Sequence, residues 1–190
     1  MPTVSAVLNS FVPMAEELSR ELGKGGCSLS FEQNCNRDLS EAEAKALKNS
    51  AIHLIRNSID HGQESPEERT QLGKNPSLTI RVFSESADRI CLGDDGRGLN
   101  LDRIAEKAKQ AGMSWTDDRS LAELIFESGL STKTAADDIS GRGVGMDAVR
   151  LMLAEVGASI TIVPVDKVGP YLKFYFAIDF ATAQSSAKAA

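Results

Sequence analysis

The sequence lacks a hydrophobic run long enough to span a membrane, and its first residues lack the basic start and apolar centre of a signal peptide. It also lacks an excess of positive charge, because 21 Lys and Arg stand against 27 Asp and Glu, for a net charge of −6. A basic surface that could neutralise nucleic-acid phosphates is therefore not expected. These absences predict a cytoplasmic protein with neither a membrane nor a nucleic acid as partner.

Cysteine is scarce. Cys27, Cys35 and Cys91 make an odd number, and no C-x-x-C pair occurs. The three residues fall in predicted strands or loops, and neither histidine stands at a recognisable zinc-site spacing from them. We therefore expect reduced structural thiols, as in a cytoplasmic protein, and no zinc site.

The 190 residues suffice for one domain with a substantial core. Apolar periodicity and cap signals predict helices over 8–22, 40–62, 65–69, 101–112, 118–126 and a segment after 146, and strands over 27–33, 77–83, 88–93, 158–164 and 171–180. This order predicts an α+β fold: a two-layer sandwich with helices on one face of a mixed, largely antiparallel sheet. The domain is expected to cover 1–180, with 181–190 as a flexible tail or linker stub.

A polar stripe follows one face of the predicted long helix. His53, Asn57, Asp60 and His61 are three to four residues apart, and they include both histidines of the chain. The stripe is either an ordinary solvated face or a ligand surface. An asparagine oxygen is a hard ligand suited to Mg²⁺, which shares its shell with water and phosphate oxygens. The spacing matches no zinc signature.

Two glycine-rich segments follow. Asp94, Gly96 and Gly98 come directly after a predicted strand, where a carboxylate could accept a hydrogen bond from an exocyclic amine and glycines could admit a flat ring. Taken alone, this segment could equally be an Asp-capped turn. Gly141, Gly143 and Gly145 precede a helix, where free N–H groups could bind phosphate. A glycine hinge would explain that second segment almost as well.

The remaining sequence narrows these alternatives. The second glycine segment is G-x-G-x-G without a clear preceding strand, so the Rossmann pattern is not met, and no P-loop pattern occurs. The stretch from Glu127 to Ser140 has little periodicity and is rich in Ser, Thr and Asp. Compact domains usually keep so long a loop for function. The four segments together predict one nucleotide site built in four pieces.

In this order the segments resemble the ATP-binding superfamily shared by gyrase, the ATP-dependent heat-shock chaperones, histidine kinases and the MutL repair proteins. Within it the chain most resembles the catalytic domain of the chemotaxis histidine kinase family CheA. "HLIRNSIDHG", "DDGRG", "FESGLSTK" and "SGRGVGMDAV" are similar to the successive boxes of that family, and the first position of the asparagine box is His53, as in CheA. The resemblance covers essentially 1–180.

The resemblance implies catalytic roles for His53 and Asn57, with Asn57 also the Mg²⁺ ligand. Asp94 would accept the adenine amine, and Ser131, Thr132 and Lys133 would belong to an ATP lid. The implied nucleotide-binding residues are Arg56, Asp60, His61, Asp94, Gly96, Gly98, Arg103, Ser131, Thr132, Lys133, Gly141, Arg142, Gly143, Val144, Gly145 and Met146. The lid departs from the family pattern, because Ser128 replaces a proline and Leu130 a phenylalanine, which predicts a less stiffened lid.

The implied function is binding of ATP and Mg²⁺ for transfer of the γ-phosphoryl group to a histidine on a phosphotransfer domain, in cis or in trans. A response regulator and a coupling protein would be partners of the full-length kinase. The alternative is a free-standing ATP-binding module that regulates a protein partner without histidine kinase activity. An ATP-driven clamp is disfavoured, because no transducer domain is recognised in the sequence.

Overall fold

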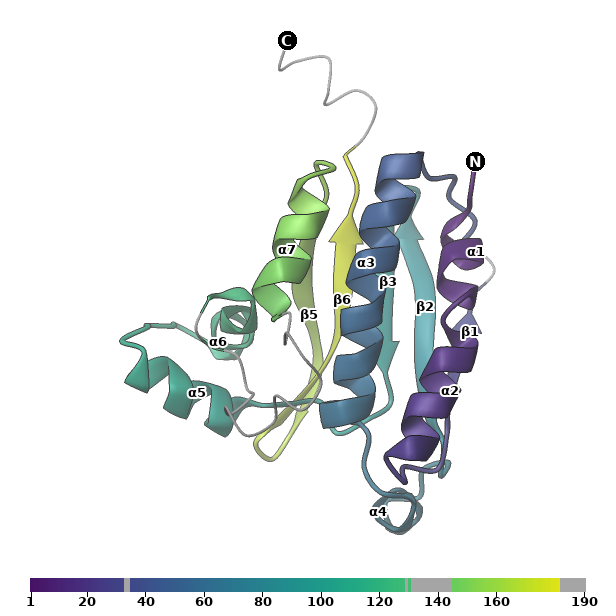
Figure 1. Cartoon of the computed structure of the whole chain (residues 1–190). Coiled ribbons are helices and arrows are strands. Elements are labelled where there is room, and N and C mark those ends of the chain that lie inside the picture. The colour runs from purple at the N-terminus through teal and green to yellow at the C-terminus, as the bar shows by residue number, and fades with distance from the viewer. Residues whose placement is uncertain (33–34, 129, 131–144, 182–190) are drawn as a thin grey trace.

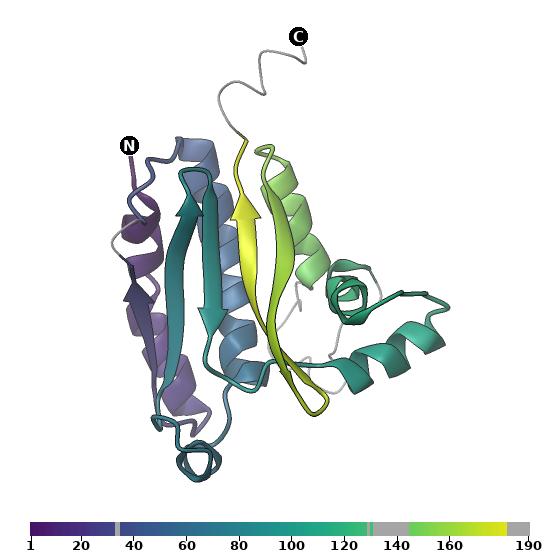
Figure 2. The ribbon, with the colours of Figure 1, turned by 180° about the vertical axis from the view of Figure 1, so that it is seen from behind.

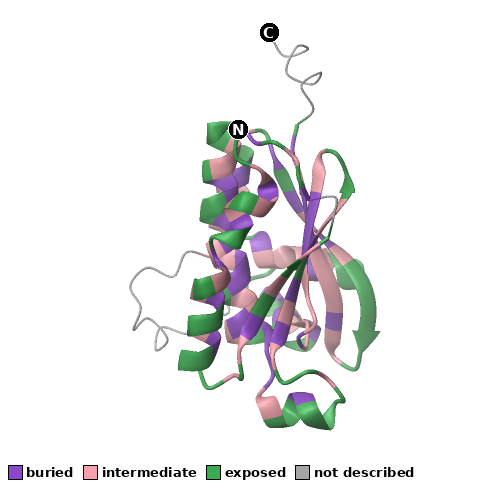
Figure 3. Ribbon diagram, turned by 90° about the vertical axis from the view of Figure 1, so that its right-hand side faces the viewer, coloured by how far each residue is buried: buried purple, intermediate pink, exposed green. Residues whose placement is uncertain are grey.

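The computed structural model describes residues 1–32, 35–128, 130 and 145–181. It has two layers: one face of a six-stranded sheet is covered by helices, and the other face is open (Figures 1 and 2). Buried residues gather between the two layers, whereas the outer faces of the helices are largely exposed (Figure 3). The predicted α+β sandwich with helices on one face is confirmed.

The sheet is mixed and largely antiparallel, as predicted. Its order is β1-β2-β3-β6-β4, with β5 paired to the other edge of β6. β1 and β2 pair in parallel, whereas the β2–β3, β3–β6, β4–β6 and β5–β6 pairings are antiparallel. The strands are β1 (Cys27–Phe31), β2 (Leu78–Ser86), β3 (Arg89–Asp94), β4 (Leu99–Asn100), β5 (Ser159–Val168) and β6 (Tyr171–Asp179).

Three features of the sheet differ from the prediction. β2 continues to Ser86, beyond its predicted end at residue 83. The short strand β4 was not predicted, because two residues are too few to show alternation. β5 continues to Val168, beyond the predicted end at residue 164, so the chain reverses at Gly169 and Pro170. Gly169 has a φ of 60°, which suits a tight reversal.

The helices are α1 (Val4–Asn9), α2 (Val12–Glu21), α3 (Glu41–Asn57), α4 (Pro66–Gln71), α5 (Leu101–Gln110), α6 (Asp118–Glu123) and α7 (Met146–Ala154). The single helix predicted over 8–22 is therefore wrong, because α1 ends before Ser10 and α2 begins at Val12. Pro13 is the reason: it lacks an N–H group and is tolerated in the first turn of a helix but not in its interior.

α3 is the central helix of the helical layer. Its start is fixed by a capping box, in which the Ser40 hydroxyl accepts from Glu43 N–H and the Glu43 carboxylate accepts from Ser40 N–H. Its apolar face, including Leu47, Leu54 and Ile55, is buried against the sheet. α7 packs beside α3 and begins near the end of α3 (Figure 1).

The three cysteines are buried free thiols, as expected for reduced structural residues. Burial raises the pKa of Cys27 and of Cys91 to about 12. Within the described part of the chain, no helix combines the length and apolar character needed to cross a bilayer.

Candidate functional site

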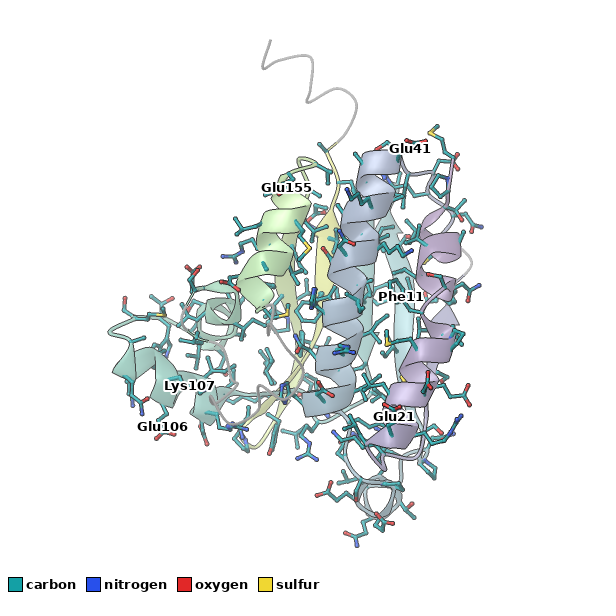
Figure 4. All side chains as sticks on the ribbon, viewed as in Figure 1. Phe11, Glu21, Glu41, Glu106, Lys107 and Glu155 are labelled. Carbon is teal, nitrogen blue, oxygen red and sulfur yellow. The ribbon has the colours of Figure 1, made fainter. Side chains whose placement is uncertain are left out.

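A cavity of about 370 Å³ lies where α3 ends and α7 begins. Glu41 and Glu155 mark the far ends of these two helices (Figure 4). The other walls come from the loop after β3, the start of α5, the short 3-10 turn Leu124–Phe126 and strand β6. Eight predicted site residues line it: Asn57, Asp60, His61, Asp94, Gly98, Arg103, Gly145 and Met146.

Asn57 is the last residue of α3 and contacts the first residue of α7. Its Nδ2 donates to Met146 Sδ at 2.8 Å. This bond uses the nitrogen of the carboxamide, so the oxygen is the atom available to a cation. A single amide oxygen with water and phosphate oxygens is a shell that suits Mg²⁺.

Beyond Asn57 the helix widens into a π-turn, Ser58–Gly62. π-turns of this kind occur frequently at functional sites. The Lys24 ammonium donates to the carbonyls of Ile59 at 2.7 Å and of Asp60 at 2.8 Å. Burial lowers the pKa of Lys24, an effect that the neighbouring Asp60 opposes. Lys24 thus anchors the turn that places Asp60 and His61 at the cavity.

Asp94 lies at the end of β3 and lines the cavity. Its Oδ1 accepts from Gly96 N–H at 2.9 Å. Burial raises the pKa of the carboxyl group, opposed by hydrogen bonds from the Ser58 hydroxyl and from Gly96 N–H. The side chain remains half-buried, because one side of it faces the cavity.

The glycines of this segment satisfy a packing constraint within the protein. A Cβ at Gly96 would collide with the carbonyl oxygen of Gly62, and one at Gly98 with that of Leu172. Gly98 also has a φ of 87°, a conformation that side chains disfavour. Both glycines were predicted to admit a ligand; Gly98 lines the cavity, whereas Gly96 does not.

Three predicted residues do not line the cavity. They are Gly96, His53, which lies one turn earlier on α3, and Arg56, which is exposed. Seven more predicted residues lie outside the described part of the chain: Ser131, Thr132, Lys133, Gly141, Arg142, Gly143 and Val144. The expected lid falls largely on these same segments.

Sequence reasoning missed much of the cavity lining. The additional residues are Lys24, Ser58, Gly62, Gln63, Arg97, Leu99, Asn100, Ile104, Ile125, Leu130, Tyr171, Phe174 and Phe176. The apolar members form a wall, and the rings of Phe174 and Phe176 meet edge to face, 4.9 Å between centroids. The alternation of Phe174 and Phe176 along β6 was a visible signal, but it is equally the signal of an ordinary core strand.

Residues on both sides of the undescribed segment 131–144 are tied together. The Arg150 guanidinium on α7 pairs with Glu127 at 2.9 Å and with Glu123 at 3.2 Å. The Ser128 hydroxyl donates to Asp147 Oδ2 at 3.2 Å. The serine that replaces the family's proline therefore makes a contact that a proline could not make.

The described residues contain no group of three or more His, Cys, Asp or Glu side chains able to hold a metal ion. A cation at this cavity would therefore depend on Asn57, on water and on oxygens of its ligand. A hard cation that keeps several waters fits that set, whereas zinc takes three or four Cys, His, Asp or Glu ligands and fits it poorly.

Comparisons with known proteins agree with this geometry. A family model described as histidine kinase-, DNA gyrase B-, and HSP90-like ATPase matches residues 42–182. The chain belongs to this ATPase family. The matched residues include α3, the Asp94 segment and α7, which are the elements that surround the cavity.

Individual relatives within this ATPase family point the same way. The chain is 32% identical to the chemotaxis protein CheA of Listeria monocytogenes over 194 residues, which is 97% of this chain and 31% of that protein. It is 38% identical to the chemotaxis protein CheA of Bacillus subtilis over 171 residues, 85% of this chain and 25% of that protein. The chain thus spans less than a third of either relative. These matches confirm the resemblance to CheA.

A solved structure supports the fold. The mycobacterial sensor histidine kinase MprB aligns with a TM-score of 0.50 at 12% identity, over 91% of this chain and 94% of that one. At this identity the likeness concerns the fold alone. The ATPase fold predicted from the order of the motifs is confirmed.

Proposed function

We propose that this domain binds ATP with Mg²⁺ and supplies the γ-phosphoryl group to a histidine on a phosphotransfer domain, in cis or in trans. The observation that carries the proposal is the placement of Asn57 and Asp94 around one cavity in a chain of this ATPase family. Through the full-length kinase, a response regulator and a coupling protein would be further partners. The cytoplasm is the expected location.

Asn57 holds the cation through its amide oxygen, with the orientation of the amide set by the bond to Met146. Bound Mg²⁺ would neutralise phosphate charge. Lys24, Arg97 and Arg103 also line the cavity and add positive charge for an anionic ligand. Positioning and charge neutralisation are the main requirements of phosphoryl transfer.

Asp94 selects the base. Its carboxylate accepts a hydrogen bond from an exocyclic amine, and the apolar wall around Ile104 and Phe174 packs against the ring. The end of the cavity near Asn57 is lined instead by the polar residues Asp60 and His61. A base end and a phosphate end can therefore be distinguished along one cavity.

The acceptor histidine belongs to another domain or protein. His61 lines the cavity and His53 lies one turn before Asn57, so both belong to the nucleotide side of the reaction. We propose that His53 acts near the terminal phosphate and that Arg56 contacts phosphate or ribose. The residues assigned to the lid, Ser131, Thr132 and Lys133, would contact the phosphates from the opposite side.

A titration tests the proposal. A non-hydrolysable ATP analogue is titrated calorimetrically into the protein with and without Mg²⁺, and labelled ATP is then supplied with a purified histidine phosphotransfer domain. We expect Mg²⁺-dependent binding and acid-labile labelling of the acceptor. Asn57→Ala should abolish the Mg²⁺ dependence while the protein stays folded, because Asn57 is at the cavity wall and not in the core.

The matched control is Asn49→Ala, an exposed asparagine on the same helix, which should behave like the parent. Binding and transfer by Asn57→Ala at parental levels would refute the metal assignment. ATP binding by the parent without transfer to any supplied acceptor would favour the regulatory module over the kinase.

A further inference from the structure

An ionic cluster with a buried centre contacts the loop that follows Asp94. At its centre is Arg69 on α4, whose side chain is 0% exposed. Its guanidinium contacts the Glu64 carboxylate at 2.9 Å and the Asp95 carboxylate at 2.8 Å. It also donates to the carbonyls of Asn75 at 2.6 Å and Ser77 at 3.1 Å. Neither Arg69 nor its carboxylate partners line the cavity.

Local sequence places Arg69 inward. Ser65 caps α4 in a capping box with Glu68, and Pro66 occupies the first turn, so the helix begins at a fixed residue. Glu64 directly precedes the cap and is itself only 3% exposed. Glu68 also pairs with Arg97, a residue of the cavity lining, at 3.1 Å.

The cluster forms hydrogen bonds with the backbone of the loop that follows Asp94. The Lys74 ammonium donates to Asp95 O at 2.8 Å and to Gly96 O at 3.1 Å, and it pairs with Glu64 at 2.6 Å. The Lys173 ammonium, from β6, also donates to Gly96 O. The carboxylate of Asp95 is held from its other side by the N–H of Thr79 at 3.0 Å.

Position, more than stability, explains such a cluster. Burying the charges of Arg69 and Glu64 costs desolvation that their attraction roughly cancels, so apolar packing could stabilise this region equally well. Burial alone would raise the pKa of Glu64, yet hydrogen bonds from Lys74 and Arg69 outweigh it and hold that pKa below its usual range. The carboxylate therefore stays ionised and keeps its directional bonds to both cations.

We propose that Glu64, Arg69 and Lys74 are positioning residues for base selection: they fix Asp95 and Gly96, and so aim the adjacent Asp94 carboxylate at the amine of the base. This inference rests on the proposed function. It makes base selection depend on residues that do not line the cavity. It also gives a role to α4, none of whose residues line the cavity.

The test compares two nucleotides that differ in a single amine. Affinities for ATP and for purine riboside triphosphate, which lacks the 6-amino group, are measured with Mg²⁺ for the parent and for Lys74→Met. We expect the parent to prefer ATP about tenfold or more, the size of a charge-assisted hydrogen bond. Lys74→Met should reduce that preference about fivefold, with affinity for purine riboside triphosphate unchanged within about twofold.

Three variants complete the design. Lys74→Arg restores the charge and should restore much of the preference. Lys48→Met is the matched control, because Lys48 is exposed on α3 and remote from the cluster. Asp95→Asn removes the charge on the loop side of the Arg69 pair and should also weaken the preference, so the test stands if Lys74→Met fails to fold.

The outcomes separate this inference from the proposed function. A parent that prefers ATP, with variants that keep the preference or lose affinity for both nucleotides equally, would overturn the positioning role alone. A parent that does not distinguish the two nucleotides would overturn the assignment of Asp94 and this inference with it.

Discussion

At the scale of one residue, Asp94 is a binding-site group whose ionisation lowers the stability of the folded protein. It lies at the end of β3, where burial raises the pKa of its carboxyl group and two hydrogen bonds only partly offset that effect. Because burial disfavours the ionised carboxylate, a ligand that donates a hydrogen bond to it would relieve part of that cost. Strained or poorly solvated groups of this kind concentrate at functional sites.

The raised pKa predicts two opposite pH dependences. The folded protein keeps the Asp94 proton where the unfolded chain has lost it, so the free energy of unfolding falls as pH rises from the ordinary carboxyl range through the raised pKa. Affinity for ATP should rise over the same window, because the ionised carboxylate is the better acceptor. Chemical denaturation and nucleotide titration as functions of pH measure the two.

In the variant Asp94→Asn, the free energy of unfolding and the ATP affinity should both lose the pH dependence that Asp94 contributes. Its ATP affinity should fall about tenfold or more, because a charge-assisted hydrogen bond contributes roughly 1.5–3 kcal/mol. Asp166→Asn, an exposed aspartate on β5, is the control and should match the parent. Parental ATP affinity in Asp94→Asn would mean that the base binds elsewhere.

At the scale of an element, the π-turn Ser58–Gly62 depends on a residue far from it in sequence. Two of its carbonyls, those of Ile59 and Asp60, accept from the Lys24 ammonium. Carbonyls at the end of a helix have no partner within the helix, so another group must supply one. Lys24 supplies this donor for the carbonyls of Ile59 and Asp60.

Lys24→Met should therefore destabilise both the turn and the site. We expect a loss of about 1–3 kcal/mol in the free energy of unfolding, as for buried acceptors left without donors. Weaker ATP binding should accompany it, since the turn carries Asp60 and His61. Lys45→Met, an exposed lysine on α3, is the control for urea denaturation and calorimetry. Unchanged binding in a destabilised Lys24→Met protein would confine this lysine to a structural role.

At the scale of the whole molecule, Phe180 anchors the chain directly after β6. Its side chain is 4% exposed, its N–H donates to Asp88 O at 2.9 Å, and the Arg37 guanidinium lies 4.5 Å from the ring centroid. Arg37 comes from the segment before α3, so Phe180 connects the end of the sheet to the helical layer. That the domain extends to residue 180 stays a prediction.

The domain limit can be tested by truncation. A chain that ends after Ala181 should keep the free energy of unfolding within about 0.5 kcal/mol, as for changes outside a packed core. Phe180→Ala should cost about 3–5 kcal/mol, because it removes a buried aromatic ring. Denaturant unfolding of the three proteins decides the matter, and a large loss on truncation would place part of 182–190 in the domain.

Local patterns predicted a large part of this protein. Ser40 and Glu43 predicted the start of α3, and the apolar patterns at 77–83 and 88–93 predicted strands where β2 and β3 lie. The helix break at Pro13 was missed, although its signal was present in the sequence. The order of the motifs identified the ATPase fold before any contact was known. These signals are readable because caps, periodicities and turns depend on residues a few positions apart.

Other features were decided only by the tertiary structure. The Lys24 contact with Ile59 spans 35 positions, that of Asn57 with Met146 spans 89, and Gly98 must be glycine because the carbonyl of Leu172 lies against it. No local pattern marks such partners, since they meet only after strands pair and helices pack. The sequence by itself therefore predicted the family and most of the elements, and it named Asn57 and Asp94 as candidate site residues. Packing decided which residues line the cavity around them and which distant side chains contact them.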